Sequence, residues 1–97
     1  MAFIGAVIKV RGVVQGVGFR YWCHRKATNY GLGGYAANLR DGSVEIGCEG
    51  DRGIVEAFIE DLKVGPTYAH ITDINIEWYE EPKGYNDFTI TFIDKYE

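Results

Sequence analysis

Near the N-terminus, apolar and polar residues alternate in the pattern of a β-strand with one buried face. The alternation covers residues 6–12, and its apolar side consists of Ala6, Ile8 and Val10. From Phe19 onward the apolar spacing changes to three and four residues, which is the period of an amphipathic helix. That stripe consists of Phe19, Cys23, Ala27 and Tyr30. We expect Gly31 to end the helix, because glycine readily adopts the left-handed conformation found there.

The middle of the chain predicts a hairpin followed by a second helix. Residues 34–40 and 43–49 flank Asp41-Gly42, a dipeptide that accepts the positive φ angles of a tight turn. Asp51 is placed to cap the second helix, and Gly65-Pro66 to stop it. The apolar stripe of this helix consists of Val55, Phe58, Ile59 and Leu62.

Two more alternating segments follow the second helix, and we interpret the order of the elements as βαββαβ, with one of these segments as a further strand. They contain Ile74, Ile76 and Trp78, and then, beyond Pro82-Lys83-Gly84, Phe88, Ile90 and Phe92. Two helices with one apolar stripe each can cover one face of a four- or five-stranded sheet. We therefore predict an α+β, ferredoxin-like two-layer sandwich, with an antiparallel sheet and both helices on one face. The expected aromatic core is Trp22, Phe58, Trp78, Phe88 and Phe92.

Length and charge narrow the classes of protein that fit. A chain of 97 residues allows one domain, spanning residues 1–97. The formal net charge of −4 argues against a general nucleic-acid surface, so a phosphate site would need a local concentration of donors. The apolar run at residues 2–8 is too short to span a bilayer and follows no basic region. We expect a cytoplasmic protein that does not enter membranes.

Neither cysteine chemistry nor a metal site is expected. Cys23 and Cys48 do not form a metal-ligand spacing with the two histidines, so free buried thiols are predicted. Cys23 and His24 do not form a nucleophile and base, because consecutive helical residues point about 100° apart. Several carboxylates lie around a predicted turn and helix start, where solvated acids are ordinary: Asp41, Glu45, Glu49 and Asp51.

Residues 13–20, VVQGVGFR, join the first strand to the first helix. Gly16 and Gly18 allow successive backbone N–H groups to converge, and the helix start adds further unpaired N–H groups, which together make an anion cradle. Arg20 is unusual there, because the helix dipole opposes a cation in the first turn. From the residues alone, either a phosphoryl ligand or a nearby carboxylate compensates it. Neither the P-loop nor the dinucleotide glycine spacing is present.

The chain resembles the acylphosphatase family over nearly its whole length, and two motifs carry the resemblance. Residues 12–20 match the family's G-x-V-Q-G-V-x-F-R motif without a mismatch. The second motif is met by G-Y-A-A-N at residues 34–38 and by D-G-S-V-E at residues 41–45. One departure is Ala37, where many relatives carry a basic or larger side chain, so the rate or substrate preference of this chain stays open.

The resemblance implies that Arg20 binds phosphate and that Asn38 orients the attacking water. The cradle would then be the backbone N–H groups of Gln15, Gly16, Val17, Gly18, Phe19 and Arg20. The implied reaction cleaves a small acyl phosphate to a carboxylate and inorganic phosphate, and it requires no cofactor or metal. The product, inorganic phosphate, is also expected to inhibit the enzyme. For one shared site, the second strand must end near the first helix's N-terminus. The apolar Leu39 is expected in the core, which turns Asn38 to the opposite face.

Two other readings of the sequence remain. One is a carbamoyl-phosphate-handling domain, as in the acylphosphatase-like modules of hydrogenase maturation proteins. The other is a non-catalytic phosphate- or RNA-binding ferredoxin-like module. The acidic charge and the lack of an RNP-type run argue against RNA, so no nucleic-acid partner is expected. We expect a monomer.

Overall fold

The computed structural model describes residues 3–95, and their side chains as far as residue 91. In chain order the elements are β1 (Phe3–Val13), α1 (Phe19–Tyr30), β2 (Gly33–Leu39), β3 (Val44–Asp51), α2 (Arg52–Val64), β4 (His70–Tyr79) and β5 (Phe88–Lys95). Both predicted helices are confirmed, and Gly31 and Gly65 follow their last residues. Asp51 occupies the N-cap position of α2, but its side chain makes no capping hydrogen bond.

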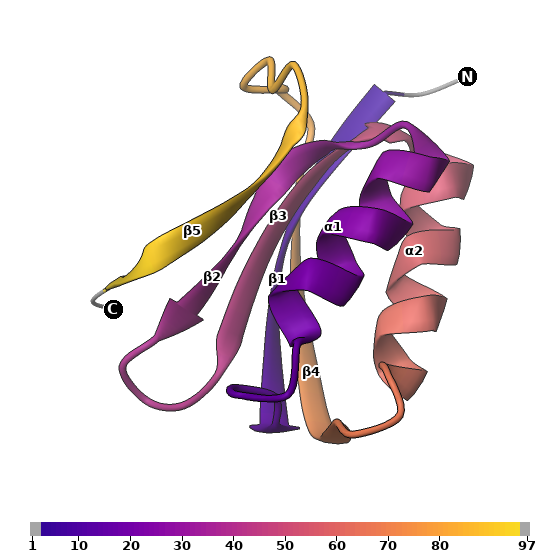
Figure 1. Ribbon diagram of the computed structural model, residues 1–97. Helices are drawn as coiled ribbons and strands as arrows, with labels where there is room; N and C mark the ends of the chain where they lie inside the picture. The colour runs from indigo at the N-terminus through magenta and orange to yellow at the C-terminus, as the bar shows by residue number, and fades with distance from the viewer. Residues whose placement is uncertain (1–2, 96–97) are drawn as a thin grey trace.

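The five strands form one sheet in the order β4-β1-β3-β2-β5, and both helices cover the same face of it (Figure 1). This is the predicted α+β, ferredoxin-like two-layer arrangement. The sheet is mixed and not wholly antiparallel as predicted, because β5 pairs parallel to β2 while the other three pairings are antiparallel. Alternation along a strand does not encode its direction, so the parallel edge could not be read from the local pattern. No helix within residues 3–95 is long and apolar enough to cross a bilayer.

The core lies between the sheet and the helices, where the apolar stripes meet. Every predicted stripe residue of α2 is buried, as are three of the four predicted in α1, with Tyr30 packed at its border. The prediction that Trp78 belongs to the core is wrong, because its side chain is 38% exposed. It lies on the edge strand β4, where the guanidinium carbon of Arg52 sits 4.8 Å from the ring centroid. The side chain of Phe92 lies outside the described ones.

The connections bring three chain segments to one end of the sheet. β1 and β2 are both antiparallel to β3, which lies between them, so β1 and β2 run in the same direction. The chain passes from β1 to β2 through α1, which is a split β-α-β unit. The end of β1, the start of α1 and the end of β2 therefore lie together, at the lower end of the molecule in Figure 1.

Candidate active site

The loop between β1 and α1 owes its shape to two glycines. Gly16 and Gly18 have φ angles of 75° and 76°, in the left-handed region. A Cβ atom at either position would meet nothing within 4 Å, so backbone conformation, not space, requires glycine. Such turns direct successive N–H groups toward one point. Gly18 is also the N-cap of α1, whose first N–H groups have no intrahelical acceptor.

Arg20 lies half-buried in the first turn of α1, as predicted. One terminal nitrogen of its guanidinium donates a hydrogen bond to the backbone carbonyl of Thr91 on β5. Thr91 is the partner of Ala37 in the β2–β5 pairing, so this contact holds Arg20 above the two strands. The first turn of α1 contains no acidic residue, so the positive end of the helix dipole faces the site without a local counter-charge.

Asn38 faces the helix side of the sheet, which corrects the predicted orientation. Ala36, two residues earlier, belongs to the core beneath the helices, and Asn38 follows it on the same face. Leu39 is also buried, but it does not join that core, so its apolar character was misleading. The register between β2 and β5 shifts between Ala37 and Leu39. The Oδ1 atom of Asn38 is buried and has no hydrogen-bond partner among the described residues.

These groups share one pocket of about 190 Å³. Its lining comprises Val14, Gly16, Gly18, Phe19, Arg20, Tyr21 and Asn38. The expected meeting of the β2 end with the N-terminus of α1 is therefore observed. The side chains of Gln15 and Val17 do not line the pocket, and Val17 packs against the core instead.

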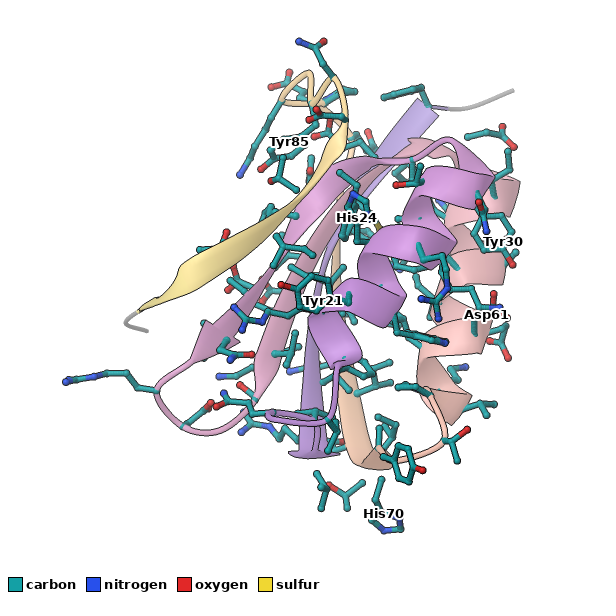
Figure 2. The ribbon with its side chains drawn as sticks, viewed as in Figure 1. Tyr21, His24, Tyr30, Asp61, His70 and Tyr85 are labelled. Atoms are coloured by element: carbon teal, nitrogen blue, oxygen red, sulfur yellow. The ribbon has the colours of Figure 1, made fainter. Side chains whose placement is uncertain are left out.

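Sequence reasoning missed two neighbours of the site. Tyr21, which is 56% exposed, extends from the first turn of α1 on the side of β2 (Figure 2). Its position directly after Arg20 was a signal that could have found it. Thr91 lies 71 residues from Arg20 in the chain, and no local pattern connects them.

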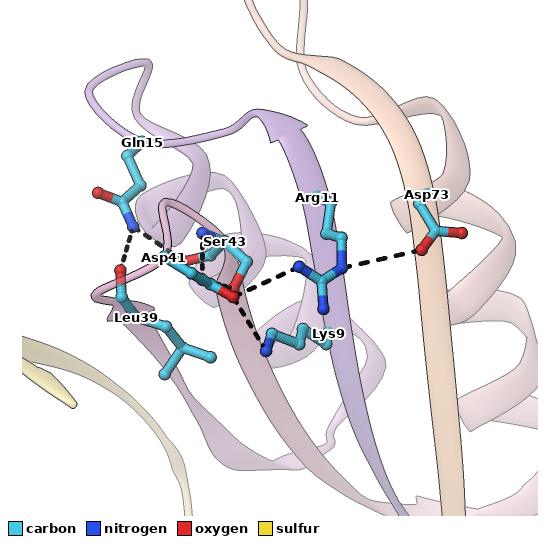
Figure 3. Close-up of polar contacts among 7 residues, drawn as sticks. All are labelled: Lys9, Arg11, Gln15, Leu39, Asp41, Ser43 and Asp73. Atoms are coloured by element: carbon cyan, nitrogen blue, oxygen red, sulfur yellow. Dashed lines mark hydrogen bonds and ion pairs between the residues drawn. The ribbon is translucent and has the colours of Figure 1, made fainter. Parts of the chain in front are cut away.

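The side chain of Gln15 ties the loop to the turn between β2 and β3 (Figure 3). Its Nε2 atom donates to the backbone carbonyl oxygens of Leu39, at 2.8 Å, and Ser43, at 2.9 Å. The sequence predicts only a backbone role for Gln15. A glutamine in a loop carries no local signal of such partners, because both are more than 20 residues away.

Asp41 organises the other side of the same turn (Figure 3). Its Oδ1 accepts hydrogen bonds from the backbone N–H of Ser43, at 2.9 Å, and from the Ser43 hydroxyl, at 2.5 Å. Its Oδ2 lies 3.0 Å from Nζ of Lys9 and 3.4 Å from a guanidinium nitrogen of Arg11, both on β1. The bonds from Ser43, with the Lys9 ammonium, hold the pKa of Asp41 well below its usual range.

Glu49 was expected to be solvated and is instead buried, with 2% of its surface exposed. Its carboxylate accepts hydrogen bonds from the Tyr79 hydroxyl and from backbone N–H groups of residues 83–85. Burial raises the pKa of Glu49, but these bonds outweigh it, so its pKa lies below the usual value. No local pattern indicates this burial, because the donors come from the end of β4 and from the loop after it.

The cysteines offer no nucleophile. Cys23 and Cys48 are both free and buried, as predicted. Burial, and secondarily Cys48, raises the pKa of the Cys23 thiol, and burial followed by Glu49 raises the pKa of Cys48 to about 12. Thiols of this kind are poor nucleophiles at neutral pH. In the described part of the chain, no three His, Cys, Asp or Glu side chains gather into a group that could hold a metal ion.

Fold and pocket together define a two-layer α+β protein with a glycine-shaped donor loop, and comparison with known proteins identifies the family. Residues 6–90 match the acylphosphatase family. The acylphosphatase of Thermotoga petrophila is 45% identical over 85 residues, which cover 88% of this chain and 93% of the relative. The chain belongs to the acylphosphatase family, and the protein is an enzyme.

Solved structures agree with this assignment. The crystal structure of acylphosphatase from Bacillus subtilis superposes with a TM-score of 0.90 at 36% identity, covering 92% of this chain and 99% of that one. Full-length HypF in its phosphate- and nucleotide-bound form gives a TM-score of 0.88 at 33% identity. That match covers 98% of this chain but only 12% of HypF.

Proposed function

We propose that this enzyme hydrolyses acyl phosphates to a carboxylate and inorganic phosphate by direct attack of water, without a metal ion. Membership of the acylphosphatase family supports the reaction class. The observation that carries the mechanism is the shared pocket, in which a buried acceptor, Oδ1 of Asn38, meets the donor loop and Arg20.

The phosphoryl group is held by Arg20 and by the backbone N–H groups of residues 15–20. A guanidinium presents a planar fork of donors that matches phosphate oxygens. The positive φ angles of Gly16 and Gly18 favour convergent N–H groups, and the helix start adds its dipole. Donors fixed in this way stabilise charge on the phosphoryl oxygens in the transition state without reorganising.

Asn38 orients the water. Its Oδ1 accepts a hydrogen bond from the water, whose oxygen attacks phosphorus as the bond from phosphorus to the carboxyl oxygen breaks. The electron pair of that bond leaves on the carboxylate, and the water proton passes to a phosphate oxygen. A carboxylic acid has a pKa near 4, so the leaving group needs no general acid.

The test follows hydrolysis of benzoyl phosphate by the purified protein in the presence of a chelator. We expect turnover, competitive inhibition by inorganic phosphate, and a loss of about a hundredfold or more in kcat for Asn38→Ala. Circular dichroism and urea unfolding check that the variant remains folded. Turnover that the chelator abolishes contradicts the metal-free mechanism, and full activity in Asn38→Ala contradicts the role of Asn38.

One alternative substrate is carbamoyl phosphate, which the family resemblance suggested; the part of HypF that shares this fold belongs to a protein solved in a phosphate- and nucleotide-bound form. Its phosphoryl group would occupy the same loop, so Arg20 and Asn38 would keep their roles. Comparing kcat/KM for carbamoyl phosphate and benzoyl phosphate on the same preparation distinguishes the two. A clear preference for carbamoyl phosphate would replace the general acyl phosphate by this narrower substrate.

A further inference from the structure

We infer that Gln15 is a positioning residue, whose carboxamide sets the place of Asn38 relative to the phosphate-binding loop. The inference rests on the proposed function, because it uses the roles proposed for Asn38 and for the loop. It concerns the side chain of Gln15, which does not line the pocket; the phosphate contact proposed above for this residue uses its backbone N–H.

The geometry makes Gln15 a clamp on the end of the β2–β3 hairpin (Figure 3). One amide nitrogen has two protons, and here it meets two carbonyl acceptors, Leu39 at the end of β2 and Ser43 directly before β3. The Ser43 carbonyl also accepts the backbone N–H of Leu39 at 2.9 Å. Since Leu39 directly follows Asn38, the clamp joins the loop to the strand within one residue of the proposed water-binding side chain.

The clamp supports Asn38 where strand pairing restrains its backbone on the β3 side only. On the β5 side, the register shift skips Asn38, although β3 still pairs with it through Val44. Its Oδ1 has no hydrogen-bond partner in the described part of the chain, so that atom is not held by a bond of its own. Asp41 fastens the turn to β1, and Gln15 fastens it to the loop.

Loss of the Gln15 clamp should therefore change the position of Asn38 without changing the binding of phosphate. Phosphate binding requires the N–H groups of the loop and Arg20, neither of which Gln15→Met removes. In-line attack also requires Asn38 to stand correctly above that phosphate, and a displacement of about 1 Å costs on the order of a hundredfold in rate. Methionine has a similar volume and no donors, so it breaks the clamp without adding charge.

The experiment compares Gln15→Met with Tyr30→Phe as a matched control. Tyr30→Phe removes one side-chain hydrogen bond, from the Tyr30 hydroxyl to Asp61 at 2.6 Å, between α1 and α2 and away from the pocket (Figure 2). For each variant we measure kcat for benzoyl phosphate, the inhibition constant of inorganic phosphate, urea unfolding, and the side-chain amide resonances of Asn38 by NMR.

We expect Gln15→Met to lower kcat about tenfold to a hundredfold, to leave the phosphate inhibition constant within about threefold, and to shift the Asn38 amide resonances. Tyr30→Phe should change none of these three. An unchanged kcat, a phosphate affinity that falls in step with kcat, or unmoved Asn38 resonances would each overturn the inference. Failure of the proposed function is distinguishable, because Asn38→Ala would then retain full activity.

Discussion

Within the described residues, the carboxylate cluster around Glu49 and the loop before α1 can be compared as places where backbone N–H groups meet, or are expected to meet, an anion. Beside β3, the carboxylate of Glu49 accepts the N–H groups of Lys83 at 2.6 Å and Gly84 at 3.0 Å. The Tyr79 hydroxyl adds a donor at 2.5 Å. Here the protein provides its own buried anion, and the loop after β4 is fastened to the sheet.

The loop before α1 has the opposite character. Its glycine turns favour convergent N–H groups, its helix start has no side-chain cap, and the first turn contains no carboxylate. An internal anion makes such a cluster part of the fold, whereas a cluster facing a pocket can bind an anion from solution. The contrast predicts that substitutions around Glu49 change stability and that substitutions around Arg20 change catalysis.

The largest effect should come from Arg20→Gln, which removes the positive charge of the proposed phosphate site and most of its side-chain donors. We expect kcat/KM for benzoyl phosphate to fall about a thousandfold, and inhibition by inorganic phosphate to be lost. Steady-state kinetics with and without phosphate measure both. A variant that retains phosphate inhibition would show that the loop binds the anion without Arg20.

Glu49→Ala should lower the stability of the protein and leave its catalysis unchanged. It leaves the Tyr79 hydroxyl and the N–H groups of residues 83–85 without their acceptor, so the free energy of unfolding should fall by about 3 kcal/mol. Urea unfolding measures this, and kcat at a temperature where the variant stays folded should match the parent. Glu60→Ala, an exposed change on α2, is the control and should unfold nearly as the parent does. A large fall in kcat would link the Glu49 cluster to catalysis and break the contrast.

Gly18→Ala and Gly31→Ala separate strain from binding. Both glycines have φ near 75° and open space around the missing Cβ, so each substitution should cost about 1 kcal/mol of stability. Only Gly18 lies in the pocket, so only Gly18→Ala should weaken phosphate inhibition, by about tenfold, which corresponds to about 1.4 kcal/mol. Equal inhibition constants in the two variants would argue against the loop as the phosphate site.

The smallest effect is the dependence of stability on pH. Asp41 and Glu49 both have folded-state pKa values below their usual ones. At acidic pH the unfolded chain therefore binds more protons than the folded one, so the contribution of these groups is complete above about pH 5 and is lost progressively as the pH falls from about 4 toward the lower folded-state pKa values. Urea unfolding between pH 7 and pH 3 should show this loss, reduced in Glu49→Gln. If the free energy of unfolding of Glu49→Gln depended on pH as that of the parent does, Glu49 would not contribute to the pH dependence.

Sequence by itself determined where the helices and strands lie, and it marked the glycine-containing loop before α1 as a candidate anion site. The apolar stripe of α2 and the alternation of β1 depend on local periodicity, which buried faces preserve. Gly16 and Gly18 predicted a turn with positive φ angles, because few other residues accept such angles. The resemblance then singled out Arg20 and Asn38, which the structure brings to one pocket.

Tertiary structure alone decided which groups meet across the sheet. The parallel pairing of β5, the Thr91 acceptor for Arg20 and the two partners of Gln15 all join segments far apart in the chain. In the local sequence, Glu49 looks like an ordinary surface acid. The cost of burying its carboxylate is offset by hydrogen-bond donors that include the backbone of a distant loop. Periodicity records which face of an element is apolar, but hydrogen bonds between distant segments depend on register and topology, which no local pattern contains.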